Sequence, residues 1–167
     1  REVDAIVFVL RAFSDNDVPG PTDPVEHLRI VEVELALADL ETTQKQLLKM
    51  EKVAKSDKSI GQILDSLKHA SEQLDQGIPI YKSDLTSSER ELLSDFFLLT
   101  DKPVLAVVNV GEDQVEETNQ ILEPVIAELP DQEVIGMCVQ LESEAALLTP
   151  EEQSEMLEEL GLGEGAL

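Results

Sequence analysis

A long stretch with a helical repeat separates two strand-like segments of this 167-residue chain. Apolar residues recur at gaps of three and four over residues 33–54 and again over residues 60–74. This spacing is typical of a heptad seam, along which one helix packs against another. The polar break at residues 55–59 predicts a short turn, so the pattern indicates an antiparallel helical hairpin with coiled-coil packing. The two seams comprise Val33, Ala36, Leu40, Thr43, Leu47, Met50 and Ala54, and then Ile60, Ile63, Leu67, Ala70 and Leu74.

The first helix of the hairpin has a clear start. Asp23 is suited to the N-cap, Pro24 to the first helical position and Glu26 to the third. A helix over residues 24–54 would be roughly 45 Å long, at about 1.5 Å per residue. Such a length favours an arm that projects from the body, although the same seams would also suit a helical subdomain packed in the ordinary way. A third helix is expected over residues 87–99.

The segments on either side of the hairpin predict an α/β domain. Residues 3–10, 103–109 and 134–139 are short apolar runs typical of strands buried on both faces of a parallel sheet. Residues 113–129 between the last two runs have helical spacing, which gives a βαβ unit, and Pro124 is expected to kink or divide this helix. A last helix is expected after Thr149, which with Pro150 and Glu152 forms a second capping signature.

The residues that leave the strand at 103–109 are candidates for a binding site. Ligands of open α/β sheets bind at the carboxyl ends of the strands, and this strand ends in Asn109-Val110-Gly111-Glu112. The Asn amide can both donate and accept hydrogen bonds, and the Glu carboxylate accepts them, so the pair could recognise a base. A polar turn with a helix N-cap is the alternative interpretation of the same residues.

These residues resemble the Asn-Lys-x-Asp nucleotide motif of GTPases, with Val110 at the Lys position and Glu112 at the Asp position. An Asn-x-x-Glu version is typical of the YchF family, also called Obg-like ATPases, and the chain is similar to that family over essentially its whole length. The most specific match is Glu-Leu-Ala-Leu-Ala-Asp-Leu-Glu at residues 34–41. The other matching segments are residues 1–7, 9–13, 23–25 and 98–104.

The resemblance implies a fold, and we divide the chain accordingly. Residues 1–27 and 84–167 would form the C-terminal half of a P-loop NTPase domain of the translation-factor class, with a mostly parallel sheet and flanking helices. Residues 28–83 would form the inserted antiparallel hairpin, or coiled coil. In this family a small ubiquitin-like TGS domain follows.

The resemblance also implies a function. The parent protein would bind ATP, or GTP, with Mg²⁺, hydrolyse it, and associate with the ribosome. Asn109 would contact the base, Val110 would contact it through its backbone, and Glu112 would occupy the position that selects the base. The fifth motif, usually Ser-Ala-Lys, aligns with Cys138-Val139-Gln140, so only main-chain contacts carry over there.

No residue of the chain is predicted to be catalytic or to bind a metal. None of the eight glycines is followed by Lys, so a Gly-x-x-x-x-Gly-Lys phosphate loop is not among these residues. We therefore expect a fragment without the phosphate loop and the TGS domain, inactive by itself.

His27 and His69 are expected to be plain surface residues, and Cys138 a small core residue. The alternative is a non-enzymatic module in which the hairpin docks on a partner and the α/β part is a platform.

The charge is distributed unevenly along the chain. The formal net charge is −24, which argues against DNA or RNA binding by the body of the protein. Residues 28–83 nevertheless carry eight of the twelve basic residues, and five of these, Lys45, Lys49, Lys52, Lys55 and Lys58, lie near the predicted tip. They could contact ribosomal RNA or simply form a solvated helix face.

The single Cys and the lack of a membrane-spanning apolar run favour a soluble cytoplasmic protein.

Overall fold

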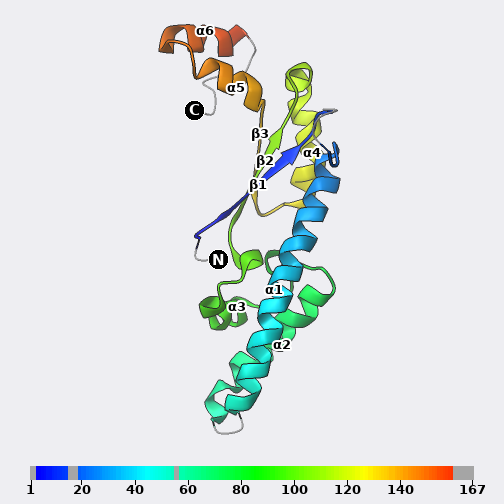
Figure 1. Cartoon of the computed structure of the whole chain (residues 1–167), viewed down its shortest axis with the longest axis vertical. Helices are drawn as coiled ribbons and strands as arrows, with labels where there is room; N and C mark the ends of the chain where they lie inside the picture. Colours follow the sequence, from blue (N-terminus) through cyan, green and yellow to red (C-terminus); the bar gives the residue numbers. More distant parts are fainter. Residues whose placement is uncertain (1–2, 15–18, 55–56, 160–167) are drawn as a thin grey trace. The chain divides into compact units, whose positions relative to one another are not determined.

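The structure is a computed structural model that describes residues 3–14, 19–54 and 57–159 (Figure 1). The chain divides into two compact units. The first contains the described residues up to Ile6 together with Arg29–Pro103, and the second contains Val7–Leu28 and the described residues from Val104 onward. Among the described helices, none is both long enough and apolar enough to cross a lipid bilayer.

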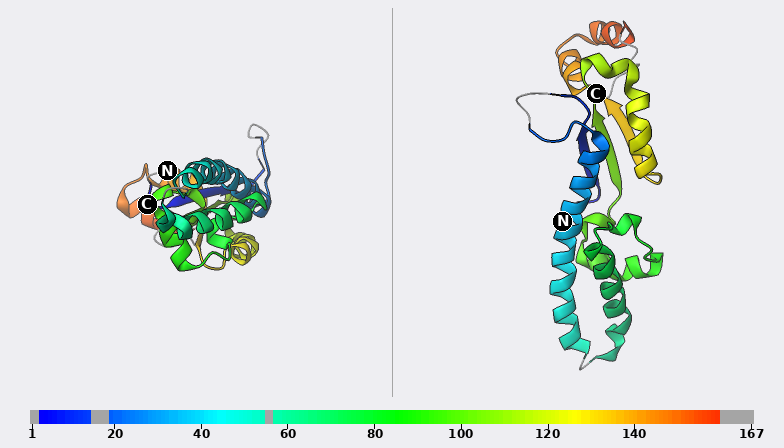
Figure 2. Two further views of the ribbon diagram at one scale, coloured as in Figure 1. Left: turned by 90° about the horizontal axis from the view of Figure 1, so that it is seen from below. Right: turned by 90° about the vertical axis from the view of Figure 1, so that its right-hand side faces the viewer.

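The first unit is helical. Helices α1 and α2 lie side by side with the chain reversing between them, as the views in Figures 1 and 2 agree. Both seams contribute to one core, in which Ala36, Leu40, Leu47 and Met50 of α1 pack with Ile63, Leu67, Ala70 and Leu74 of α2. Val33, by contrast, is exposed. The elements of this unit are α1 (Pro24–Ala54, whose first residues belong to the second unit), η1 (Lys58–Ile60), α2 (Gly61–Asp75), η2 (Ile80–Lys82), α3 (Ser87–Leu93), η3 (Ser94–Phe96) and η4 (Leu99–Asp101).

Helix α1 begins at the predicted residue for the predicted reason. The Asp23 carboxylate accepts the N–H of Val25 at 2.8 Å and of Glu26 at 3.4 Å, so it caps the first turn. The predicted third helix is shorter than residues 87–99. It is capped by a reciprocal pair, in which Thr86 Oγ1 accepts the N–H of Glu89 and the Glu89 carboxylate accepts the N–H of Thr86. It ends at Leu93, and single turns of 3₁₀ helix follow.

Two buried carboxylates of α1 hold the segments that follow α2. Asp39 is fully buried, and its oxygens accept the N–H groups of Leu99 and Thr100 at the start of η4. Glu32 accepts the hydroxyl of Tyr81 at 2.5 Å and pairs with the ammonium of Lys82 at 2.6 Å. Because buried carboxylates need such partners, these contacts fix where the chain returns along α1.

The second unit contains the sheet. Its elements are β1 (Ile6–Arg11, whose first residue belongs to the other unit), β2 (Val104–Asn109), η5 (Glu112–Glu117), α4 (Thr118–Glu128), β3 (Glu133–Met137), α5 (Val139–Ala145) and α6 (Pro150–Glu159). The strand order is β1-β2-β3. Strands β2 and β3 are parallel, with Asn109 paired to Met137 at their carboxyl ends. The α/β class with a parallel sheet is therefore confirmed.

The strands and the helix between them differ from the sequence-based expectations in three respects. Burial on both faces is wrong for β1, because Val7 and Val9 are 55% and 59% exposed while Phe8 and Leu10 are buried. Buried and exposed residues alternate along β1, so the described residues cover only one of its two faces. The segment at 113–129 is a 3₁₀ turn followed by α4, and Pro124 lies inside α4 without dividing it.

Candidate functional site

The segments that follow the three strands converge on one small cavity at the carboxyl ends of the sheet. The cavity has a volume of about 60 Å³. Phe13 comes from the segment after β1, and the other lining residues follow β2 and β3. They are Asn109, Val110, Gly111 and Glu112, and then Cys138 and Gln140. A space of this size suits contact with one edge of a flat ring rather than the enclosure of a whole nucleotide.

Asn109 is the last residue of β2, and its side chain links β2 to β3. Its Oδ1 accepts the N–H of Val139, the first residue of α5, at 3.1 Å. Because the amide oxygen faces Val139, the amide NH₂ is the group that can donate to a ligand. Val139 is half-exposed and does not line the cavity, so its contribution is this hydrogen bond.

The loop after Asn109 is held by its own backbone. Val110 is 2% exposed, and its N–H donates to the carbonyl of Met137 at 3.0 Å, which continues the pairing of β2 with β3. A main-chain contact from Val110 to a ligand would therefore use the carbonyl. Glu112 is exposed at the start of η5, where its carboxylate can accept from a donor in solution.

Phe13 was missed by the sequence analysis, and it gives the cavity an aromatic wall. The guanidinium of Arg11 lies 5.9 Å from the centre of the Phe13 ring. Arg11 is 9% exposed, and it donates from Nη2 to the carbonyl of Gly20 at 2.7 Å and to that of Pro21 at 3.2 Å. An aromatic residue three places after the strand-like run at residues 3–10 was the available signal, but one sequence does not show which chain segment meets the end of β2.

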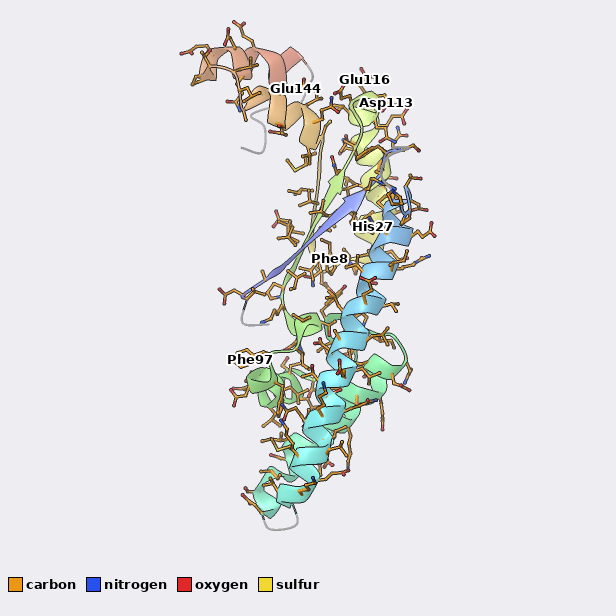
Figure 3. All side chains as sticks on the ribbon, viewed as in Figure 1. Phe8, His27, Phe97, Asp113, Glu116 and Glu144 are labelled. Atoms are coloured by element: carbon orange, nitrogen blue, oxygen red, sulfur yellow. The ribbon has the colours of Figure 1, made fainter. Side chains whose placement is uncertain are left out.

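Cys138 lies between β3 and α5 and is buried, as expected for a small core residue. Gln140 is exposed at the start of α5. Acidic side chains surround this end of the sheet, and Figure 3 labels Asp113 and Glu116 on η5 and Glu144 on α5. The edge therefore combines apolar walls with a few polar groups in a negative environment.

The lysines singled out near the hairpin turn are only partly described. Lys45, Lys49 and Lys52 are exposed on α1, and Lys45 pairs with Glu41 one turn earlier at 2.5 Å. Lys55 lies outside the described residues, and the structure describes the backbone of Lys58 but not its side chain.

The two histidines are not plain surface residues, which corrects the sequence-based expectation. His27 Nδ1 accepts the N–H of Arg11 at 3.2 Å, so it binds the end of β1. His69 bridges Glu89 and Asp84, with 2.9 Å to each carboxylate. The hydrogen bond to Glu89 is the main cause that raises the pKa of His69. Among the residues that the structure describes, no group of three or more His, Cys, Asp and Glu side chains is placed to hold a metal ion.

Comparisons with known proteins give a consistent result. No protein-family model matches the chain. The whole chain aligns with the ribosome-binding ATPase YchF of Bacillus subtilis at 38% identity and with that of Escherichia coli O157:H7 at 34%, covering 48% and 47% of those proteins. Obg-like ATPase 1 of Saccharomyces cerevisiae is 33% identical over 96% of the chain and 44% of its own length.

The structural comparison agrees with the sequence comparison. The solved structure of the Schizosaccharomyces pombe YchF GTPase superposes with a TM-score of 0.80 and 28% identity, over 96% of this chain and 47% of that one. The chain thus spans about half the length of the relatives it matches. The resemblance seen in the sequence is confirmed, and these 167 residues are homologous to one half of the YchF and Obg-like ATPases.

Proposed function

We propose that this chain supplies the base-recognition edge of a nucleotide-hydrolysing protein that associates with the ribosome. The observation that carries the proposal is the convergence of the segments after β1, β2 and β3 on one cavity. Ligands of parallel α/β sheets bind at this edge. The names of the relatives, ribosome-binding ATPase and YchF GTPase, support the activity and the partner.

The chemistry of the lining residues suits a purine. The ring of Phe13 and the buried Val110 offer apolar surface to the flat base, and the amide of Asn109 offers donors to its ring nitrogens. Guanine presents a ring N–H and an exocyclic amine, and the Asp carboxylate of the related GTPase motif accepts hydrogen bonds from both. The longer Glu112 displaces that acceptor, and Val110 lacks the Lys stem that would lie along the base, so we propose a preference for ATP over GTP.

The phosphates and their Mg²⁺ would be held by residues outside the motifs present here, because no glycine of this chain is followed by Lys. Mg²⁺ would neutralise charge on the transferred phosphate when it is bound. The residues of this chain would bind and orient the base, which places the nucleotide. We expect no ATP turnover by the isolated 167 residues, and measurable turnover would overturn that expectation.

We also propose that residues 28–83 act as a coiled-coil arm with a basic tip that contacts ribosomal RNA. The packing of α1 on α2 and the exposure of Lys45, Lys49 and Lys52 support this role. The acidic remainder of the chain would be repelled by RNA, so the tip would orient the protein on the ribosome in the cytoplasm.

Nucleotide titration of the complete protein tests the main proposal. ATP should bind more tightly than GTP, and Asn109→Ala should weaken ATP binding about tenfold, the effect of losing one good hydrogen bond to the base. Gln153→Ala, a change on α6 away from the lining residues, is the control and should bind ATP like the wild type. Equal ATP affinity of the wild type and Asn109→Ala would show that the base does not bind at this edge of the sheet.

A further inference from the structure

Gln114 makes hydrogen bonds to the segments that follow two different strands. It lies in η5, and its side chain is half-buried. Its Oε1 accepts the N–H of Gly111, after β2, at 2.9 Å, and its Nε2 donates to the carbonyl of Ala12, after β1, at 2.9 Å. Its own N–H also donates to the carbonyl of Gly111 at 3.0 Å. One side chain therefore connects the segment that contributes Phe13 to the cavity with the segment that contributes residues 109–112.

The backbone of Gly111 lies close to Phe13 and Gln114. A Cβ on Gly111 would lie 2.7 Å from Asp113 Oδ1, 3.3 Å from Phe13 Cβ and 3.4 Å from Gln114 Oε1. A side chain at Gly111 would require Asp113 to turn away and Phe13 and Gln114 to shift by a few tenths of an ångström, so the backbone of Gly111 approaches both residues closely. The N–H of Ala12 also donates to the carbonyl of Asn109 at 2.9 Å. Ala12 is therefore bound through its N–H to the end of β2 and through its carbonyl to Gln114.

The chemistry of these contacts selects an amide. The N–H of Gly111 needs an acceptor and the carbonyl of Ala12 needs a donor, and a Gln side chain supplies both. A Glu of the same length supplies only the acceptor, and its charge would face the carbonyl of Ala12. A Met of similar volume supplies neither group.

From these contacts we infer that Gln114 is a positioning residue of the base-recognition edge. It sets the distance between Phe13 and the loop that contains Asn109 and Glu112, and so the width of the cavity that would contact the edge of the base. This inference rests on the proposed function. Gln114 does not line the cavity, so it acts through Ala12 and Gly111 rather than by touching the base.

A matched pair of variants tests the inference in the complete protein. Gln132 also accepts a backbone N–H, that of Val104, at 2.9 Å, but at the opposite end of β2. Gln114→Met removes two side chain to backbone hydrogen bonds after the carboxyl end of β2, and Gln132→Met removes one at the opposite end of the same strand. The measurements are the Kd values of ATP and GTP by titration, and the Tm of each variant.

We expect Gln114→Met to weaken ATP binding about tenfold, as the loss of two hydrogen bonds at a site allows, and to reduce the preference for ATP over GTP. Gln132→Met, which loses one hydrogen bond rather than two, should lower the Tm by a smaller amount and leave both Kd values unchanged. Gln114→Glu, which keeps the acceptor for Gly111, should lie between the wild type and Gln114→Met in ATP affinity. If Gln114→Met proves too unstable to assay, Gln114→Glu decides the question by the same comparison with Gln132→Met.

Asn109→Ala separates the two ways in which this test can fail. If Asn109→Ala weakens ATP binding while Gln114→Met and Gln114→Glu bind ATP like Gln132→Met, the positioning role is wrong and the base site stands. If Asn109→Ala binds ATP like the wild type, the proposed function of this edge is wrong, and the role of Gln114 falls with it.

Discussion

Asp39 and Thr100 are joined by two hydrogen bonds, from the backbone N–H of Thr100 at 2.7 Å and from its hydroxyl at 2.9 Å, both to Oδ2 of Asp39. Oδ1 of Asp39 accepts the N–H of Leu99 at 2.9 Å. The two residues belong to the segments at 34–41 and 98–104 that carry much of the resemblance to the YchF family. Two motifs that are far apart in the sequence are therefore parts of one contact.

Replacing Asp39 by Asn should destabilise the protein strongly. The amide keeps one acceptor oxygen and turns its NH₂ toward a backbone N–H, so a buried donor loses its partner. We expect a loss of about 3 kcal/mol in the free energy of unfolding, the usual cost of breaking a buried charged hydrogen-bond group. Urea denaturation followed by circular dichroism measures it. Asp75→Asn, on the exposed face of α2, is the control and should change stability by less than about 0.5 kcal/mol.

Tyr81 should remain protonated as long as the protein is folded. Burial is the main cause that raises its pKa well above 10, and the hydrogen bond to the Glu32 carboxylate adds to the effect. A group whose pKa is raised on folding stabilises the fold below its unfolded pKa, so this contribution is lost as the pH rises above about 10. Tyr81 is the only Tyr of the chain, and the chain has no Trp, so its ultraviolet absorbance reports one group. Absorbance of the phenolate should rise together with the loss of helical circular dichroism, and an earlier rise would contradict the prediction.

The His69 and Glu89 pair predicts a stability maximum at mildly acidic pH. The pKa of His69 is raised, so its contribution is present below about 6.5 and is lost as the pH rises through the folded value. The hydrogen bonds from His69 and Thr86 lower the pKa of Glu89 to about 2, so its contribution is present above 4.5 and is lost as the pH falls toward 2. The Tm should therefore peak between these limits. His69→Ala should flatten the decline toward neutral pH, and an unchanged profile would show that the pair has no such effect.

Shortening Glu112 to Asp should shift the base preference toward guanine. Asp at this position restores the acceptor length of the related GTPase motif, so it can reach the N–H and amine of guanine. We expect the ratio of GTP affinity to ATP affinity to rise about tenfold, the effect of one added charge-assisted hydrogen bond. Competition titrations on the complete protein give the ratio. Glu116→Asp, an exposed change in the same η5, is the matched control and should leave the ratio unaltered.

Reversing the charge of the five tip lysines should weaken ribosome binding by the complete protein. Lys45, Lys49, Lys52, Lys55 and Lys58 changed together to Glu would turn attraction for phosphate into repulsion. The affinity should fall, and what remains should depend less steeply on salt. Co-sedimentation at several salt concentrations measures both. Lys68→Glu, on the exposed face of α2, should have little effect, whereas wild-type affinity of the fivefold variant would make the tip a spacer.

Regular periodicity and capping residues predicted the elements well. Residues 24–54 form α1 and begin at the Asp23 cap because the heptad pattern and the cap act locally. The positions of Asn109 and Cys138 at strand ends followed from the two apolar runs before them. Phe13 and Gln114 could not be predicted, because their roles depend on which segment folds back beside which strand. The exposure of Val7 and Val9 was missed for the same reason, since an apolar run does not show how many faces of a strand are covered.

The buried carboxylates at Glu32 and Asp39 are seven residues apart on α1, which is the period of its apolar seam. An apolar repeat alone would let the packed segments slide along α1 by one heptad with little change in buried area. The two carboxylates have different partners, a phenol with an ammonium for Glu32 and backbone N–H groups for Asp39. A slide of seven residues would bring one carboxylate to the donors of the other and leave the remaining buried carboxylate without the donors described here. The different hydrogen-bond partners of Glu32 and Asp39 therefore fix one register of the packed segments along α1.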